Sequence, residues 1–306
     1  MMLLLGAATS SDIDWLVLLM TLFGGLALFL FGMDRLTTTL KAVAGDRMKL
    51  TLAKLTGNRV AGLATGAGIT AVIQSSSVTT VLVVGFISAG LMTLPQSIGV
   101  ILGADIGTTI TAQIIAFKVT KYALLLVALG FGAAFISGRE RVKSAGFGLM
   151  GLGLIFYGMA VMSDAMEPLR TYEPFIDAME QLENPLLGIL AAAVFTALVQ
   201  SSSATIGIII VLAGQGLVSL EAGISLLFGA NIGTTVTALL AAIGRSRDAL
   251  RAAVAHAIFK VVGVLLWVFF IDEFARLATS ISPQSASLSG ADRLAAETPR
   301  QIANAH

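Results

Sequence analysis

Long apolar stretches, broken by small polar clusters, are the dominant pattern of the sequence. From residue 60 to residue 117 the one charged residue is Asp105, and between Asn184 and Gly244 it is Glu221. About a quarter of the residues of a soluble domain are charged, so such a domain does not contain stretches like these. We therefore expect apolar helices that cross a lipid bilayer.

The polar clusters occur twice at one spacing. Gln-Ser-Ser-Ser at 74–77 recurs at 200–203, an offset of 126 residues (200 − 74). Gly-Ala-Asp-Ile-Gly-Thr-Thr at 103–109 returns at 229–235 with Asn in place of Asp, at the same offset. The match continues without a gap on both sides of these motifs, which indicates an internal duplication.

Each half contains four apolar units. The first, residues 15–36 and 144–166, is long enough to cross about 30 Å of hydrocarbon at 1.5 Å per residue. The second, residues 60–91 and 186–217, has Gln-Ser-Ser-Ser at its middle. Its two arms are about 14 residues each, or roughly 21 Å of helix, which is too short to span. We expect a re-entrant hairpin that turns at the polar cluster.

The third and fourth units complete each half. The third, residues 95–117 and 221–242, is long enough to span, and we expect its glycine-containing motif to break it. The fourth, residues 121–137 and 249–271, is predicted as another spanning helix. The expected fold is an all-α integral membrane protein with two inverted-topology repeats. Its parts are repeat 1 at 1–143, repeat 2 at 144–271, and a polar C-terminal tail at 272–306 that we expect to be poorly ordered.

Charge placement orients the predicted helices. A hairpin adds no net crossing, so each half crosses three times and the second half inserts upside down relative to the first. With the loop at 34–59 inside, twelve basic residues lie in the inner loops and three in the outer loops, as the positive-inside rule requires. The acidic loop at 167–185 and both termini then lie outside, in a multi-pass protein of the cell (inner) membrane.

Composition excludes other classes of protein. The chain is 56% hydrophobic and 12% charged, and its net charge of +1 offers no electrostatic surface for nucleic acid. The absence of cysteine excludes disulfides, thiolate metal sites and a cysteine nucleophile. Neither a Gly-x-Ser-x-Gly elbow nor a Gly-x-x-x-x-Gly-Lys-(Ser/Thr) loop is present, so we expect no hydrolase, no ATP-driven pump and no resident cofactor. Residues 1–5 lack the basic leader of a cleavable signal peptide.

Inverted repeats with interrupted helices are typical of secondary transporters. Broken helices expose N–H groups that attract anions, while hydroxyl and amide groups supply donors for an oxyanion and oxygen ligands for a hard monovalent cation. The alternative role of a serine-rich stretch is hydrogen bonding between membrane helices, which the duplication disfavours. We expect the two hairpin tips to meet in one central site for an anion and sodium. The candidate binding residues are Gln74, Ser75, Ser76, Ser77, Asp105, Thr108, Thr109, Gln200, Ser201, Ser202, Ser203, Asn231, Thr234 and Thr235. Sodium is expected near Gln74, Ser76, Gln200, Ser202 and Thr234.

The paired motifs at 74–77, 200–203, 103–109 and 229–235 resemble those of the type II sodium/phosphate cotransporter family. The resemblance covers most of residues 20–271. It implies sodium-coupled movement of inorganic phosphate, with the two Gln-Ser-Ser-Ser clusters forming the substrate and sodium region and an extracellular segment before the second cluster. Many bacterial members append a cytosolic helical domain that resembles the phosphate regulator PhoU, and we expect none within this sequence.

Two positions depart from the family pattern. Asp105 stands where the second repeat and the family pattern have Asn, and Lys260 replaces the Asn of a family His-x-x-Phe-Asn pattern at 256–260. Because an intramembrane charge is expensive, we hypothesise that Asp105 and Lys260 form an ion pair whose ammonium occupies a position that elsewhere needs a cation. The alternative is that Lys260 reaches an interface while Asp105 is paired locally. His256, one turn before Lys260, either contacts a proton or phosphate or makes a structural hydrogen bond.

Several functions remain open at this point. Phosphate export, transport of another small oxyanion, and a non-transporting membrane sensor or scaffold are the alternatives to symport. A scaffold does not explain polar residues that are duplicated in both halves. Sodium and proton coupling are both compatible with the motifs, and the sequence carries no indication of the oligomeric state.

Overall fold

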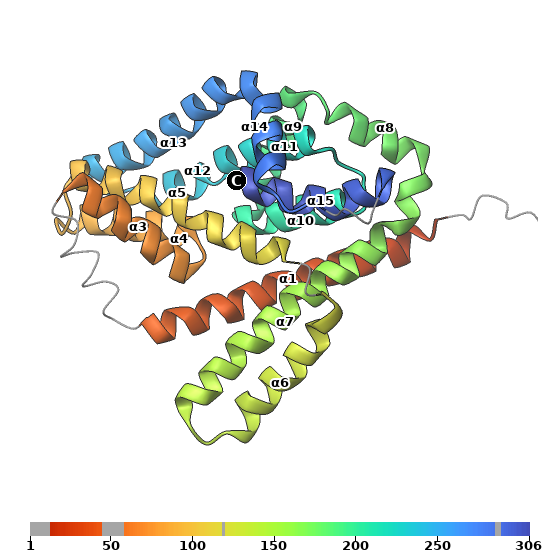
Figure 1. The fold of residues 1–306 in the computed structure, drawn as a ribbon. Coiled ribbons are helices and arrows are strands. Elements are labelled where there is room, and N and C mark those ends of the chain that lie inside the picture. The colour runs from red at the N-terminus through yellow and green to blue at the C-terminus, as the bar shows by residue number, and fades with distance from the viewer. Residues whose placement is uncertain (1–12, 45–57, 118–119, 285–288) are drawn as a thin grey trace, which may run out of the picture.

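The computed structural model describes residues 13–44, 58–117, 120–284 and 289–306, and these residues form helices and no strand (Figure 1). Parts of the predicted topology lie outside the described residues, namely the segments 1–12, 45–57, 118–119 and 285–288. The helices are α1 (Trp15–Ala44), α3 (Arg59–Ile73), α4 (Ser76–Ser88), α5 (Leu94–Ala116), α6 (Ala123–Ile136), α7 (Glu140–Met166), α8 (Glu173–Gln181), α9 (Pro185–Val199), α10 (Ser202–Gly214), α11 (Leu220–Gly233), α12 (Thr235–Ala242), α13 (Arg247–Trp267), α14 (Ile271–Ile281) and α15 (Gly290–Ala305).

Five helical stretches within the described residues are long and apolar enough to cross a membrane, and the bent pair α8 and α9 adds a sixth if it counts as one span. Their outward side chains are large and apolar, as at Leu16, Met20 and Phe23 of α1. Such side chains suit contact with lipid and not with water. The predicted all-α, multi-pass membrane protein is thereby confirmed. The five stretches are 15–42, 94–116, 140–171, 220–242 and 247–281.

The equivalent helices α1 and α7 cross each other in close contact through glycine (Figure 1). A Cβ atom on Gly25 would lie 2.8 Å from the Gly158 carbonyl oxygen, and one on Gly32 would lie 2.6 Å from that of Gly151. Gly25 and Gly151 are one offset of 126 residues apart, as are Gly32 and Gly158. The same contact is therefore made twice, and the two helices run antiparallel because one residue number rises as the other falls.

A helical hairpin forms at each Gln-Ser-Ser-Ser cluster. In the first half, a 15-residue and a 13-residue helix meet at Gln74 and Ser75, and the second half repeats these lengths at Gln200 and Ser201. The hydroxyl oxygen of each serine accepts a hydrogen bond from the backbone N–H three residues later and so caps the second helix. The prediction of a turn at each polar cluster is confirmed.

The predicted break in the third unit is wrong in the first half, where α5 runs without interruption for 23 residues. Its glycines serve close packing instead, since a Cβ on Gly107 would lie 2.5 Å from the Ala67 carbonyl oxygen of α3. Contact with a neighbouring backbone offsets the weak helix propensity of glycine, about 1 kcal/mol relative to alanine. In the second half α11 ends at Gly233 and α12 begins at Thr235, but Thr234 between them keeps right-handed helical backbone and donates its N–H to the Ala230 carbonyl, so residues 220–242 remain one stretch.

The fourth units and the tail also differ from expectation. In the first half the apolar helix at 120–136 is shorter than the five spanning stretches. In the second half α13 continues into α14, and together they are long enough to cross a membrane. The tail is not poorly ordered where it is described, since α15 packs against α5, α10, α11 and α14. Ile302 and Ala303 of α15 are fully buried. The polar composition of the tail hid this narrow apolar stripe.

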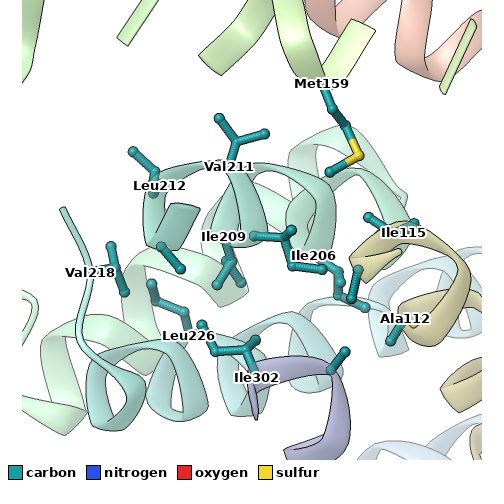
Figure 2. Packing of buried hydrophobic residues seen from close by; sticks show 14 of the residues in the cluster. Ala112, Ile115, Met159, Ile206, Ile209, Val211, Leu212, Val218, Leu226 and Ile302 are labelled. Atoms are coloured by element: carbon teal, nitrogen blue, oxygen red, sulfur yellow. The ribbon is translucent and has the colours of Figure 1, made fainter. Parts of the chain in front are cut away.

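The core surrounds α10, the second helix of the second hairpin (Figure 2). Ile206 and Ile209 of α10 point into a cluster with Ile115 of α5, Leu226 of α11 and Ile302 of α15. In the first half, α4 packs against α12 and α13. The second helix of each hairpin therefore contacts the third unit of the other half, α10 against α5 and α4 against α12.

Candidate functional site

Both hairpins turn on a glutamine in an unfavourable backbone conformation. Gln74 and Gln200 each have φ of 59°, and they are the two non-glycine residues with positive φ among the described residues. Left-handed backbone costs a residue with a side chain about 1–2 kcal/mol, and such strain persists where the surroundings hold it. Each side-chain amide donates through Nε2 to the carbonyl three residues earlier, of Ala71 and Ala197. The two amides are thus held in one orientation at the polar clusters.

The two glutamines differ in what their carbonyl oxygens contact. Oε1 of Gln200 accepts a hydrogen bond of 2.8 Å from the Thr237 hydroxyl. The equivalent atoms in the first half, Gln74 Oε1 and Thr111 Oγ1, are both buried without a hydrogen-bond partner among the described residues. A buried polar atom left unpaired costs about 1–3 kcal/mol, so such atoms normally hold water or an ion. The first-half pair is therefore open to a ligand.

The serines of both clusters lie at helix starts. Ser76 and Ser77 occupy the first turn of α4, and Ser202 and Ser203 occupy the first turn of α10. Backbone N–H groups in a first turn have no partner within their own helix and carry positive partial charge. These turns therefore combine N–H and hydroxyl donors, which are the groups that bind an oxyanion.

The predicted threonines use their protons within their own helices. Thr108 donates to the Ala104 carbonyl at 3.1 Å, and Thr109 donates to that of Ile106 at 2.6 Å. In the second half, the hydroxyls of the Thr234–Thr235 pair each donate to a carbonyl 2.7 Å away. A hydroxyl that has donated its proton still offers lone pairs, so these threonines suit a cation better than an anion.

One lysine joins the two copies of the second motif. Nζ of Lys260 on α13 lies 2.9 Å from Oδ1 of Asp105 on α5 and 2.9 Å from Oδ1 of Asn231 on α11. The lysine side chain is 10% exposed and the aspartate side chain 15%, so the pair lies inside the helix bundle. The hypothesised ion pair is confirmed, and the alternative in which Lys260 reaches the surface is wrong.

One histidine contacts this pair, and a second is within range of its charges. Nε2 of the buried His256 is 3.6 Å from Oδ1 of Asp105. His256 makes no hydrogen bond through either ring nitrogen within the described part of the chain, and Oδ2 of Asp105 likewise has no partner there. His306 lies close enough to Lys260 and Asp105 to interact with both charges.

At the polar clusters, the second helix of each hairpin contacts the third unit of the other half, α10 against α5 and α4 against α12. Within the described part of the chain, no hydrogen bond joins the two Gln-Ser-Ser-Ser clusters, and no group of three His, Cys, Asp or Glu side chains suits a metal ion. Sequence reasoning missed Thr111 and Thr237, although the offset of 126 residues relates them, and it missed His306, because the tail was not expected to pack.

A cavity of about 940 Å³ lies away from these clusters, between α8, the turn before α11, and α15. Its lining includes Glu180, Glu183 and Glu221, with Arg170 and Arg293. Glu221 lies in the first turn of α11, where a carboxylate suits the positive end of the helix dipole. The cavity has both charge signs on its wall.

Comparison with known proteins identifies relatives. The Na+/Pi-cotransporter family profile matches residues 28–164 and 172–283. An uncharacterised protein, YqeW of Bacillus subtilis, is 32% identical over 261 residues, which cover 84% of each chain. The "Putative inorganic phosphate export protein YjbB" of Escherichia coli K12 is 29% identical over 273 residues, 88% of this chain and 50% of that protein.

A human relative matches a shorter region. The sodium-dependent phosphate transport protein 2C of Homo sapiens is 45% identical over 85 residues, 26% of this chain and 14% of that protein. The chain thus spans about half the length of the YjbB relatives and a smaller part of the human one. No solved structure matches the chain.

Proposed function

The chain belongs to the Na+/Pi-cotransporter family, and on this premise we propose that it carries inorganic phosphate together with sodium by alternating access to one central site. The family and the phosphate-transport relatives support phosphate as the substrate. The names of the family and of the human relative support sodium as the coupling ion. The proposal includes no catalytic role and no resident cofactor.

The observation that carries this proposal is one polar geometry built twice. In each half a left-handed glutamine separates two short helices, a serine caps the second helix, and two threonine hydroxyls bridge the pair. The bridging oxygens are 2.8 Å apart for Thr70 and Thr79, and 2.7 Å apart for Thr196 and Thr205. A site reached alternately from both faces uses both copies, whereas a scaffold or sensor needs neither.

We further propose that the halves are inverted in the membrane and that the hairpins are re-entrant. The antiparallel crossing of α1 and α7 supports inversion, because an axis in the membrane plane relates equivalent helices in this way. Hairpin arms of 15 and 13 residues are shorter than the roughly 20 residues of a spanning helix, which supports re-entry. The positive-inside count then places both termini outside an inner membrane.

Within the site, we assign the anion and the cation to different groups. Phosphate binds at the first turns of α4 and α10, where N–H and hydroxyl donors concentrate. Sodium binds to oxygens that offer a free lone pair. These are the amide oxygen of Gln74 and the threonine hydroxyls whose protons already bond a helix carbonyl. In this proposal the remaining predicted residues of both clusters line the space between the phosphate and the sodium ion.

Uptake of radiolabelled phosphate into proteoliposomes tests the function. An inward sodium gradient should drive accumulation, and choline in place of sodium should abolish it. Ser76→Ala and Ser202→Ala should each reduce the initial rate at least roughly tenfold, since each removes a donor worth about 1.5–3 kcal/mol to a charged ligand. Ser280→Ala, at an exposed position of α14, is the matched control and should transport normally. Accumulation that ignores sodium would overturn the coupling.

Export is the second candidate, and the YjbB relatives favour it by name. The same vesicles, preloaded with phosphate, distinguish the two directions when sodium is supplied on one side at a time. An excess of arsenate added with phosphate tests the selectivity for the anion. Loss of labelled phosphate against its own gradient, without sodium-driven accumulation, would replace symport with export.

A further inference from the structure

The contacts of Lys260 concern one position shared by both halves. Asp105 and Asn231 are the same position of the duplicated motif, and each presents one oxygen at 2.9 Å to the same ammonium. The lysine itself comes from a third helix, α13, which packs against both α5 and α11. One positive charge therefore lies between two equivalent oxygens, one from each half.

We propose that the Lys260 ammonium is a built-in cation that fills a place where the fold otherwise holds a sodium ion, so that this chain couples phosphate movement to one sodium ion fewer. This inference rests on the proposed function for its link to transport. The binding part does not depend on transport and is tested separately.

The chemistry of the cage supports an exchange of ammonium for sodium. Both carry one positive charge and both are satisfied by carboxylate and amide oxygens. A carboxylate in the bundle needs a compensating charge, and Lys260 supplies it with a direct contact to Oδ1 of Asp105. Without the lysine, the same two oxygens would face each other across a space with a net negative charge.

The placement of charge in only one half also fits this exchange. Asp105 stands where the second half has the amide of Asn231, and Lys260 contacts both side chains from α13. Asp105 and Lys260 together carry one negative and one positive charge. Either charge alone would be unpaired inside the membrane, which is energetically costly. Oδ2 of Asp105 and His256 lie at the edge of the cage without hydrogen bonds among the described residues, so the cage has acceptor capacity to spare.

Thermal unfolding in detergent with sodium as the only probe tests the binding part. Lys260→Ala should unfold roughly 5–10 °C below wild type in choline chloride, because it leaves a buried carboxylate unpaired. Sodium chloride should restore at least half of that shift, and it should stabilise wild type and Lys260→Arg by much less. Lys121→Ala, at an exposed position before α6, is the control and should behave as wild type. An identical sodium response in Lys260→Ala and wild type overturns the proposal.

A second variant keeps the test open if Lys260→Ala does not fold. Asp105→Asn with Lys260→Asn restores an all-amide cage without an unpaired charge. Its phosphate uptake should depend on sodium with a Hill coefficient about one unit above that of wild type, and an unchanged coefficient overturns the proposal. If wild type transports no phosphate, the proposed function fails, whereas the sodium dependence of unfolding still decides whether Lys260 fills a cation place.

Discussion

At the scale of single residues, the two glutamines hold the clearest difference between the halves. Both are held in left-handed backbone, but Gln200 has the Thr237 hydrogen bond that Gln74 lacks. The offset of 126 residues was the signal that relates Thr111 to Thr237. That Thr237 bonds its glutamine while Thr111 does not was not predictable from the sequence, because it depends on the distances between α9 and α12 and between α3 and α5. The Asp105 and Lys260 pair was predictable because two charges in apolar helices require partners.

Replacing each glutamine by glycine should separate strain from hydrogen bonding. Gln74→Gly relieves left-handed strain but loses the hydrogen bond from Nε2 to the Ala71 carbonyl, and these effects offset, so its free energy of unfolding should stay within about 1 kcal/mol of wild type. Gln200→Gly also loses the Thr237 bond and should be about 1 kcal/mol less stable than Gln74→Gly. Thermal unfolding in detergent measures both, with Gln284→Gly on an exposed segment as a control. Equal stability of the two variants would contradict the difference between the halves.

At the scale of helices, glycine decides how closely neighbours approach. We expected glycine to break the third unit, yet Gly107 lies in continuous helix against the α3 backbone. The duplication and both hairpins were predictable, since the motifs repeat at one offset and the arms have a clear length. The continuity of α5 and the packing of α15 were not, because a glycine-rich motif and a polar tail give the same sequence pattern whether or not a partner helix covers them.

Adjacent glycines on α1 give a matched test of this packing. Gly25→Ala places a Cβ 2.8 Å from the Gly158 carbonyl oxygen and should destabilise the protein by about 1–3 kcal/mol. Nothing lies within 4 Å of a Cβ on Gly24, so Gly24→Ala should be neutral or stabilising by up to about 1 kcal/mol. Unfolding temperatures in one detergent compare the two variants. A similar drop in unfolding temperature for both variants would contradict a role of the α1–α7 crossing in stability.

At the scale of the whole molecule, the proposed topology determines which loops lie on each side of the membrane. The loop before α7 is predicted inside and α8 outside, on the positive-inside count. Glu140 and Glu180 are exposed in these two places. Only α7 separates the two positions, so this pair tests whether α7 crosses the bilayer and in which direction.

Labelling of single cysteines measures this orientation directly, because the chain has no cysteine of its own. In intact cells, a membrane-impermeant maleimide should label Glu180→Cys and leave Glu140→Cys unlabelled. After permeabilisation both should react, which shows that each site is accessible. Labelling of Glu140→Cys in intact cells would reverse the proposed topology.

The glycine crossing of α1 and α7 also describes how such a chain arises. Each contact joins one residue of the first half to a non-equivalent residue of the second, Gly25 to Gly158 and Gly32 to Gly151. Expressed in the numbering of one half alone, both are a contact between Gly25 of one copy and Gly32 of another. The crossing is therefore self-complementary, the geometry of a symmetric homodimer. Joining two such copies end to end preserves every contact of the crossing while leaving each half free to diverge, as Asp105 and Asn231 have.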